Sequence, residues 1–385
     1  MKIVHLGWVK LPENYHEKEL IKLRHPGRWV LNHALAQKSI GLDVEIVTLV
    51  HGAKKDYVLE VEGNKVHYLR TAHKWRHMTF YAIDQIRVAR YVKKLKPDFV
   101  HAHGTEEAYG WAAQRIGLPY CITAQGLFFQ IIPTLKRKPS IHEKFLKWGE
   151  NVVLKRAKHV IAKSEYVRDA LAEKYPHLQL ELIPNTYEPT LAREIVFPKQ
   201  QAFAFVGCID DRKGVHLIAE ALKIVINEFP NVKLHIAGNN KECSQTLYEQ
   251  SVIKDLRETL GENLILHGRV PSDELFKVLD ECVAIVAPST EEMFGNQLIE
   301  GLMRGCHGIV TDQTAMAENV RRFGNGTIVP QGDSCAIADA MIEILKSPPK
   351  EDVIQKARQN INDYMSPKAV AEKSFNYYKK IVENN

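Results

Sequence analysis

Short apolar runs rich in valine and isoleucine alternate along the chain with segments whose apolar residues recur every three or four positions. Runs that are apolar at consecutive positions are typical of strands covered on both faces of a parallel sheet. They predict strands at Ile3–Leu6, Val44–Val50, Phe99–Ala102, Tyr120–Ala124, His159–Ala162, Phe203–Gly207, Lys233–Ala237, Leu264–His267, Val283–Ala287 and Gly308–Val310. The intervening segments predict amphipathic helices at Ile83–Leu95, Val215–Glu228, Ser272–Glu281 and Cys335–Leu345. This alternation predicts an α/β fold with doubly wound parallel sheets.

The regular alternation breaks near Ile183-Pro184-Asn185, where a strand-like run ends and a polar, proline-containing stretch follows. We therefore expect two Rossmann-like domains, residues 1–190 and 191–365. The remaining segment, 366–385, predicts a last amphipathic helix that packs back toward the first domain. Two such domains imply a cleft, and ligands of these sheets bind beyond the carboxyl ends of the strands.

Charge is uneven along the chain and supports the same division. Residues 1–190 hold 30 basic and 19 acidic residues, whereas residues 191–385 hold 22 and 27, which gives net charges of +11 and −5. A basic first domain indicates an anionic partner: a phosphorylated substrate, a membrane surface or nucleic acid. No helix-turn-helix or RNP-type motif accompanies the charge, which argues against nucleic acid.

Composition is that of a soluble globular protein, with 45% hydrophobic and 25% charged residues among 385, and it excludes a disordered or collagen-like chain. No apolar run approaches the 18 or so residues that a membrane helix needs, and the first apolar run predicts a strand, not a signal peptide. The six cysteines form no CxxC pair, and the histidines form no HExxH motif. We expect free thiols, a cytoplasmic location and no metal site.

The most informative segment is Ala287–Glu300, which predicts a strand, a loop with Glu292, a glycine and a helix beginning near Asn296. Backbone N–H groups at such a helix start favour an anion, and Gly295 permits close approach to it. A carboxylate one turn later, Glu300, can accept hydrogen bonds from the vicinal hydroxyls of a ribose. The alternative is that both glutamates only complement the helix dipole.

Glu292 and Glu300 enclose seven residues, and this segment resembles the E-x₇-E region of family 4 glycosyltransferases, which are retaining enzymes of the GT-B fold. The family continues with a G-x-P-V-V-x-T run, and here Gly305–Thr311 differs by placing His307 and Gly308 at the proline and first valine positions. The resemblance covers nearly the whole chain and is more specific in its second half.

A second motif, Phe205–Gly214, resembles the V-G-R-L-x-x-x-K-G sequence of the same family. The resemblance implies that Lys213 pairs with the diphosphate of the donor, where negative charge grows on the leaving group. The family's arginine is replaced by Cys208, and Arg212 is the candidate to supply its guanidinium. The alternative for the basic pair is a solvated loop.

In the first domain, Asp98–Glu106 resembles the family's V-H-x-H strand end, which implies that His103 contacts the donor sugar or its phosphate. His101 is the structural member of that pair. Gln125 ends another strand, where relatives often have histidine, and either contacts a sugar or caps a loop. Gly7 and Gly27 match a glycine-bearing loop of the family, although the intervening charged insertion leaves its role open.

Glycines also end two strands of the second domain, at Gly238 and before Arg269, and the resemblance places the nucleotide base beside them. The segment Ile131–Lys158 holds eight basic residues with interleaved aromatics. It predicts either a helix at an anionic membrane surface or a core-packed helix with a solvated basic face.

The resemblance as a whole implies a hexosyltransferase-type enzyme that moves a sugar from a nucleotide-diphosphate sugar, most simply a UDP-sugar, to a glycan or lipid-linked acceptor in cell-surface polysaccharide synthesis. It needs no cofactor or metal. The alternatives are a nucleotide-sugar epimerase or hydrolase, or a catalytically silent nucleotide-sugar-binding protein. The candidate residues are, as catalytic groups, His103, Lys213 and Glu292; as donor contacts, Gly7, Arg212, Gly238, Arg269, Phe294, Gly295, Asn296 and Glu300; and as acceptor contacts, Gln125 and Gly27.

Overall fold

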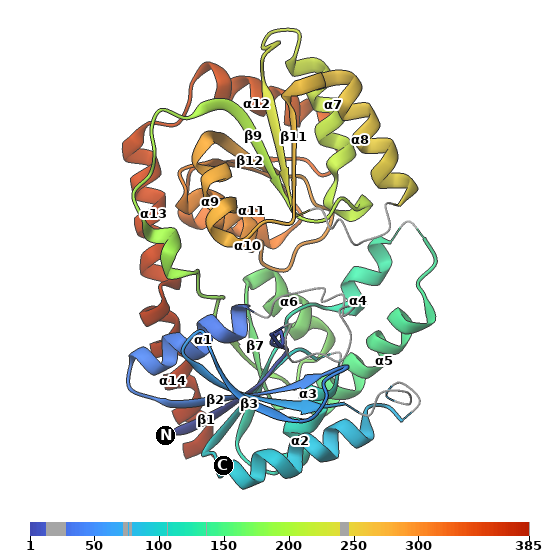
Figure 1. Ribbon diagram of the computed structural model, residues 1–385, viewed down its shortest axis with the longest axis vertical. Helices are drawn as coiled ribbons and strands as arrows, with labels where there is room; N and C mark the ends of the chain where they lie inside the picture. The colour runs from blue at the N-terminus through green and yellow to red at the C-terminus, as the bar shows by residue number, and fades with distance from the viewer. Residues whose placement is uncertain are drawn as a thin grey trace. The chain divides into compact units, whose positions relative to one another are not determined.

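The computed structural model describes residues 1–12, 28–71, 76, 79–105, 107–135, 137–238 and 246–384. The chain forms two compact units (Figure 1). The first comprises residues 1–133, 137–186 and 365–385, and the second comprises 134–136 and 187–364. The change of unit therefore falls after Thr186, and the C-terminal helix belongs to the first unit.

The first unit contains a sheet of eight strands in the order β3-β4-β2-β1-β5-β6-β7-β8. All neighbours are parallel except β3, which runs antiparallel to β4 at one edge. The strands are β1 (Lys2–Leu6), β2 (Asp43–Val50), β3 (Tyr57–Val61), β4 (Asn64–Arg70), β5 (Phe99–His103), β6 (Tyr120–Thr123), β7 (His159–Ala162) and β8 (Gln179–Leu182). Strands β1 and β5 are buried almost throughout, as expected for strands covered on both faces.

Helices cover this sheet, and the C-terminal helix α14 packs against α1 from the other end of the sequence (Figure 1). The helices are α1 (Arg28–Ser39), α2 (Ala82–Leu95), α3 (Ala108–Ile116), α4 (Phe128–Ile131), α5 (Ile141–Arg156), α6 (Glu165–Lys174) and α14 (Pro367–Glu383). A short 3-10 turn, Ile132–Thr134, follows α4.

The second unit contains a sheet of six parallel strands in the order β11-β10-β9-β12-β13-β14. The strands are β9 (Gln200–Val206), β10 (Lys233–Ala237), β11 (Leu264–Gly268), β12 (Cys282–Ala287), β13 (His307–Thr311) and β14 (Gly326–Val329). The helices are α7 (Val215–Val225), α8 (Leu247–Leu260), α9 (Ser272–Glu281), α10 (Asn296–Met303), α11 (Ala315–Phe323), α12 (Ser334–Lys346) and α13 (Glu351–Met365). Three 3-10 turns, Pro189–Ala192, Asp211–Lys213 and Gly261–Asn263, complete the unit.

The ten predicted strands are all present, with ends that differ by at most three residues, and the doubly wound α/β fold is confirmed. The hairpin β3–β4 was not predicted. Its strand β3 alternates half-buried and exposed residues, so it is not covered on both faces as the predicted strands are. The turn uses Glu62 and Gly63, both with positive φ (47° and 73°), as a two-residue hairpin connection requires.

Gly308, which departs from the family pattern, has a steric explanation in the second unit. A Cβ at this position of β13 would lie 2.6 Å from Leu298 Cδ1 of α10. The neighbouring His307 pairs with Asn325 (3.2 Å) and Thr327 (2.8 Å) within the sheet layer. The altered residues thus support close packing of α10 on β13.

Five cysteines of the described residues are free thiols, as predicted: Cys121, Cys208, Cys282, Cys306 and Cys335. Across the same described residues, every helix is too short or too polar to span a bilayer.

Candidate functional site

Among the parallel strands of each sheet, the strand order reverses direction once, between β1 and β5 in the first unit and between β9 and β12 in the second. In doubly wound sheets the connections leave opposite faces at this point, so the carboxyl ends of the two strands frame a ligand site. The predicted residues His103, Lys213 and Glu292 lie at the end of one of these four strands or shortly after it.

In the second unit, the loops after β9 and β12 are packed tightly on one another. Gly214 has φ 70°, and a Cβ there would lie 2.3 Å from the carbonyl oxygen of Pro288. The Thr290 amide donates to the Arg212 carbonyl (2.8 Å). Asp210 accepts a bond from the Lys213 amide (2.9 Å) and so caps the turn that carries Lys213. These contacts fix both loops against each other.

The result is an ion pair between Lys213 Nζ and Glu292 Oε2, both largely buried, with 14% and 17% of their side chains exposed. Gln297 Nε2 donates to the same carboxylate (3.3 Å). Burial raises the pKa of Glu292, but the charges of Lys213 and Arg212 and the bond from Gln297 outweigh it and hold the pKa at about 2. We call Lys213, Arg212, Glu292 and Gln297 the charged site.

Arg212 lies in this site through its own bonds. Its Nη1 donates to the Glu291 carbonyl (2.8 Å), and its Nη2 lies 3.8 Å from Asp210. The guanidinium therefore crosses from the β9 loop to the β12 loop. Arg212 and Lys213, predicted together, do lie together beside Glu292.

Helix α10 begins at the predicted position. Its N-cap Gly295 has φ 83°, and a Cβ there would lie 2.4 Å from Met316 Cγ of α11. Phe294 is buried, and its carbonyl accepts a bond from Asn319 (2.7 Å). Asn296 is exposed at the helix start, and Glu300 is half-buried one turn later.

Backbone hydrogen bonds join the glycines that follow β9 and β10 to the ends of β10 and β11. The Gly207 amide donates to Ala237 (2.9 Å), and the Gly238 amide donates to Gly268 (2.8 Å). A Cβ on Gly238, which has φ 104°, would lie 3.1 Å from the Gly207 nitrogen. Arg269 is exposed directly after β11.

In the first unit, four buried histidines gather at the reversal between β1 and β5. We call His5 of β1, His33 of α1, and His101 and His103 of β5 the histidine cluster. Burial lowers the pKa of His5 to about 4 and of His33 to about 3. Burial, then the neighbouring imidazoles, also holds the pKa of His101 and His103 well below the usual value. All four rings are therefore neutral at pH 7.

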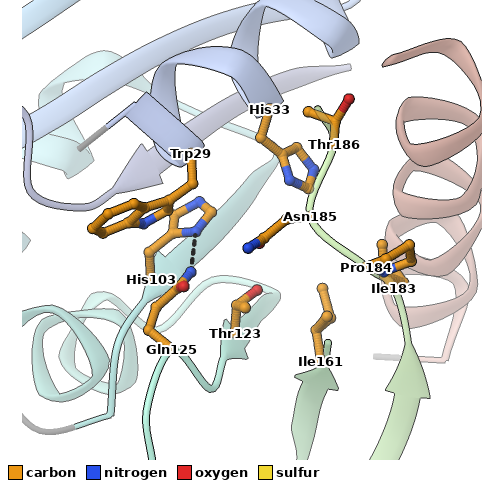
Figure 2. A pocket seen from close by; sticks show the side chains of 10 residues that line it. All are labelled: Trp29, His33, His103, Thr123, Gln125, Ile161, Ile183, Pro184, Asn185 and Thr186. Carbon is orange, nitrogen blue, oxygen red and sulfur yellow. Dashed lines mark hydrogen bonds between the residues drawn. The ribbon is translucent and has the colours of Figure 1, made fainter. Parts of the chain in front are cut away.

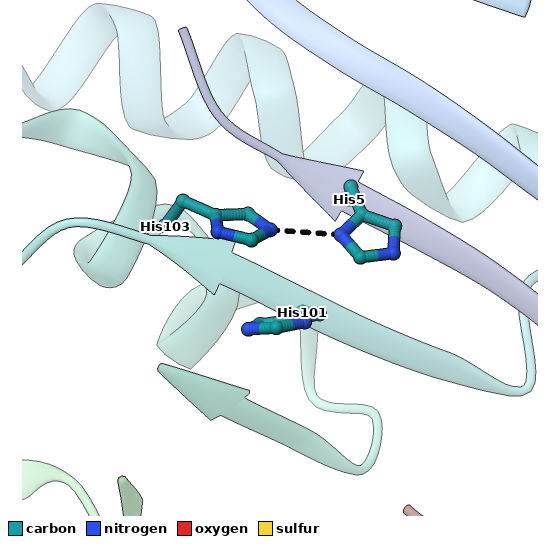
Figure 3. A group of neighbouring side chains, drawn as sticks. All are labelled: His5, His101 and His103. Atoms are coloured by element: carbon teal, nitrogen blue, oxygen red, sulfur yellow. Dashed lines mark hydrogen bonds between the residues drawn. The ribbon is translucent and has the colours of Figure 1, made fainter. Parts of the chain in front are cut away.

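Hydrogen bonds join the cluster to the C-terminal helix. His103 Nε2 and His5 Nδ1 are 2.8 Å apart (Figure 3), and His5 Nε2 is 2.8 Å from Gln37 Oε1. Gln37 Nε2 donates to the Tyr378 hydroxyl of α14 (2.9 Å). The Tyr378 hydroxyl lies 2.6 Å from His101 Nδ1.

A pocket opens beside this cluster, wholly within the first unit (Figure 2). Its lining is Trp29, His33, His103, Thr123, Gln125, Ile161, Ile183, Pro184, Asn185 and Thr186. Gln125 Nε2 lies 3.3 Å from His103 Nδ1, and Lys163 Nζ donates to Gln125 Oε1 (3.0 Å). The predicted His103 and Gln125 therefore line one pocket.

Of the remaining predicted residues, Gly7 lies beside His103: a Cβ on Gly7 would be 3.3 Å from His103 Cβ and 2.8 Å from Val30 Cγ2. Only glycine fits there. The predicted Gly27 lies outside the described residues.

Within the described residues, His5, His101 and His103 have ring nitrogens close enough to hold a metal ion, all within 4.8 Å of one another. Protein groups account for both nitrogens of each ring: His101 Nε2, for example, lies 2.6 Å from Thr123 Oγ1. We therefore assign these rings to a hydrogen-bond network and not to a metal centre.

Several residues of both sites were not predicted. His5 lies in β1, and Lys163 directly follows β7. A polar residue within or just after a predicted apolar strand was a signal that could have identified both. Gln297 lies one residue into a helix whose start was predicted. Nothing in the local sequence indicates Tyr378, because its partner Gln37 is 341 residues away along the chain.

The two-sheet architecture and these strand-end sites define the GT-B class of glycosyltransferases. Two family profiles match the chain: "Glycosyl transferases group 1" over residues 189–361 and "Glycosyl transferase 4-like domain" over residues 26–186. The chain belongs to the GT-B glycosyltransferases of the family 4 type.

Among curated proteins, the chain is 29% identical over 148 residues to a phosphatidyl-myo-inositol mannosyltransferase of Mycobacterium leprae, and the match spans 37% of each chain. Among solved structures, it is similar to a sucrose-phosphate synthase of Thermosynechococcus elongatus (17% identity, TM-score 0.81, all of both chains). It is also similar to Anabaena HepE solved with UDP and glucose (15% identity, TM-score 0.72, 98% and 99% of the two chains). At these identities the structural likeness shows the fold.

Proposed function

We propose that this protein is a retaining glycosyltransferase that moves a sugar from a nucleotide-diphosphate sugar, most simply a UDP-sugar, to a glycan or lipid-linked acceptor. A role in cell-surface polysaccharide synthesis fits such an acceptor. The second unit binds the donor and the first unit binds the acceptor in this proposal.

One observation carries the proposal. Two cationic side chains from the β9 loop, Arg212 and Lys213, meet the carboxylate of Glu292 from the β12 loop at the strand-order reversal. A diphosphate needs the cations, and sugar hydroxyls need the carboxylate as an acceptor. A site for a neutral ligand would not need two cations beside the carboxylate.

Each group has a role. Arg212, Lys213 and the amides at the start of α10 hold the diphosphate, and Glu300 accepts bonds from the ribose hydroxyls. Glu292, ionised because its pKa is about 2, accepts bonds from hydroxyls of the transferred sugar. Lys213 then contacts both the phosphate and Glu292, so the Lys213–Glu292 ion pair is already in place when the donor binds.

In the reaction, the bond between the anomeric carbon and the phosphate oxygen breaks, and a bond from that carbon to the acceptor oxygen forms on the same face. The acceptor proton passes to the departing phosphate, whose growing charge Lys213 and Arg212 stabilise. No protein carboxylate needs to act as a nucleophile, and no metal is required in this scheme.

The relatives support the ligand classes. HepE binds UDP and glucose in its crystal structure, and the mannosyltransferase is named for a phosphatidyl-inositol substrate. The exposed side chains of Ile141 (89%) and Trp148 (44%) on the basic helix α5 support peripheral contact with an anionic membrane. Co-sedimentation with anionic but not zwitterionic vesicles tests that contact.

The deciding experiment is a thermal-shift panel of UDP, GDP, ADP and their sugar conjugates on the full chain. Ligand at 100 times its Kd stabilises the folded protein by about 2.7 kcal/mol. We expect one nucleotide family to raise the melting temperature, and the rise to be lost in Glu300→Gln. The matched control is Glu318→Gln, a half-buried helix glutamate of the same unit, which should keep the shift.

No shift with any nucleotide would overturn the donor assignment. The mechanism has its own tests: the anomeric configuration of the product, read by NMR, and transfer in the presence of EDTA, which should be unchanged. Consumption of the donor without an acceptor would favour a hydrolase or epimerase. Tight nucleotide binding without any turnover would favour a silent binding protein.

A further inference from the structure

Eight side chains of the first unit form one continuous line of hydrogen bonds. It starts at the ammonium of Lys163, directly after β7, and ends at the hydroxyl of Thr123 at the end of β6. The members in order are Lys163, Gln125, His103, His5, Gln37, Tyr378, His101 and Thr123. Every link is between 2.6 and 3.3 Å.

The line can run in only one direction, because one end cannot accept. An ammonium only donates, so the amide oxygen of Gln125 must face Lys163 and its NH₂ must donate to His103 Nδ1. A neutral imidazole donates through one nitrogen and accepts through the other. His103 Nε2 therefore donates to His5 Nδ1, and His5 Nε2 donates to the Gln37 oxygen.

The same rule carries the direction further. The Gln37 NH₂ donates to the Tyr378 hydroxyl, whose proton then goes to His101 Nδ1. His101 Nε2 donates to Thr123 in turn. In the reverse direction the Gln125 NH₂ would face the ammonium of Lys163. Both groups only donate, so no hydrogen bond could form between them. A single cation thus decides the tautomer of three imidazoles.

We propose that Lys163 is a positioning residue that, through Gln125, holds His103, His5 and His101 each as the neutral tautomer protonated at Nε2. His103 then presents an acceptor nitrogen, Nδ1, at the pocket. A ligand hydroxyl can replace the Gln125 amide as the donor to that nitrogen, whereas a phosphate or carboxylate oxygen cannot. The contact of His103 is therefore with a sugar hydroxyl and not with phosphate, a step that rests on the proposed function.

A second histidine of the pocket, His33, is also protonated at Nε2, and a separate contact determines this. Ser374 donates its proton to the Val370 carbonyl (2.7 Å), so it must accept from His33 Nε2 (3.0 Å). His33 Nδ1 is then the acceptor nitrogen of that ring. The charged or titratable groups around His103 are His5, His33, His101 and Lys163, and the low pKa values of the rings agree with neutral imidazoles.

The test is a long-range ¹⁵N–¹H correlation spectrum of the histidine-labelled full chain without ligand, assigned by single histidine substitutions. At pH 7 we expect His5, His101 and His103 each to show a protonated Nε2 and an unprotonated Nδ1. In Lys163→Met the direction is no longer fixed, and all three should show mixed tautomers. Lys163→Arg keeps a donor-only group and should restore the single tautomer.

Removing a member farther along the line should change the tautomers only of the histidines that follow it. Tyr378→Phe removes the donor to His101 and should free that ring alone, with His103 and His5 unchanged. Tyr377→Phe is the matched control: it removes the hydroxyl of the adjacent tyrosine on α14, which donates to Gln179 (3.1 Å) outside the line. It should leave all three tautomers unchanged.

Either a protonated Nδ1 on His103 in the unmodified protein or unchanged tautomers in Lys163→Met would overturn the proposal. Transfer kinetics provide the functional readout. We expect Lys163→Met to lower kcat/KM by about fivefold, the value of one weakened hydrogen bond, and Lys163→Arg to recover it. Since the spectra need no substrate, a failure of the proposed function would leave the tautomer result standing.

Discussion

The candidate sites of the two units lie at the same topological position, but the first holds neutral side chains and the second holds charged ones. In the first unit, the reversal between β1 and β5 holds neutral imidazoles inside the sheet layer, with His5 and His101 completely buried. In the second, the reversal between β9 and β12 holds a cation and an anion on loops beyond the strands, with 14% and 17% of the side chains exposed.

The difference shows how position along the strand sets charge. Residues within a buried strand lose solvation on both sides, so His5 and His101 stay neutral and hydrogen-bonded. Residues a few positions beyond the strand end keep partial solvent contact and can pair as ions, as Lys213 and Glu292 do. The first arrangement suits hydroxyl ligands, and the second suits an anionic diphosphate.

The largest expected effect falls on the charged site. Lys213→Ala should lower kcat by roughly a hundredfold, because one electrostatic contact to the leaving phosphate contributes about 3 kcal/mol to transition-state stabilisation. The control Lys223→Ala removes another ion-paired lysine of the same unit, on α7 beside Asp255 (2.6 Å), and should leave kcat unchanged. Equal rates for Lys213→Ala and the unmodified enzyme would show that the charged site does not act on phosphate.

Acid should destabilise the first unit more than the second, because burial lowers the pKa of all four imidazoles of the histidine cluster. In the second unit, the histidines whose pKa is lowered are His235, His267 and His307. The unfolded His5 imidazole takes up a proton below about pH 6.5, whereas the folded one does so only near pH 4. His5 therefore contributes its full stabilisation above pH 6.5, and about 3 kcal/mol is lost as the pH falls to 4. Glu292, with its pKa lowered from 4.5 to about 2, loses its contribution only between those two values.

Tryptophan fluorescence reads this difference directly, because all five tryptophans precede residue 149 and belong to the first unit. Far-ultraviolet circular dichroism, by contrast, follows the helices of both units. In urea titrations from pH 7 to pH 4.5, the fluorescence midpoint should fall earlier and farther than the circular dichroism midpoint. Midpoints that move together would contradict independent acid sensitivity of the histidine cluster.

A smaller effect concerns the loop that carries Lys213. Gly214→Ala places a Cβ 2.3 Å from the Pro288 carbonyl at φ 70°, so we expect a loss of about 2 kcal/mol in the free energy of unfolding, together with weaker nucleotide binding. Gly117→Ala is the control, since Gly117 has nearly the same backbone conformation as Gly214 (φ 73°, ψ 28° against φ 70°, ψ 25°) but nothing within 4 Å. It should cost roughly 1 kcal/mol from backbone strain alone and leave binding intact.

The smallest effect is that of salt. Raising ionic strength screens the charge of free UDP fully and that of the largely buried charged site less, so UDP binding should weaken by a few fold, about 1 kcal/mol or less. The neutral histidine cluster should be insensitive, and the tryptophan-reported midpoint at pH 7 should change little. Uridine, which has no phosphate, is the control ligand; an equal salt effect on uridine would argue against a phosphate contact.

The strands around both reversals and three residues of the charged site, Arg212, Lys213 and Glu292, could be predicted because their signals are local. Continuous apolar runs identified every strand around both reversals, and Lys213 and Glu292 follow β9 and β12 closely enough to be found by position. The edge strand β3 was missed, because its apolar run is limited to Tyr57-Val58-Leu59 and its turn residues, Glu62 and Gly63, are not an Asn-Gly or Asp-Gly pair.

Local sequence was enough to establish the alternation of strands and helices, the glycines that the loops require and the residues that follow each strand, because these depend on neighbours within a few positions. Packing between distant segments established which strands adjoin, that Lys213 pairs with Glu292, and that Gln37 and Tyr378 complete the hydrogen bonds of the histidine cluster. Burial also set the neutral state of the histidines, because desolvation depends on the residues packed around a ring and those residues come from distant parts of the chain.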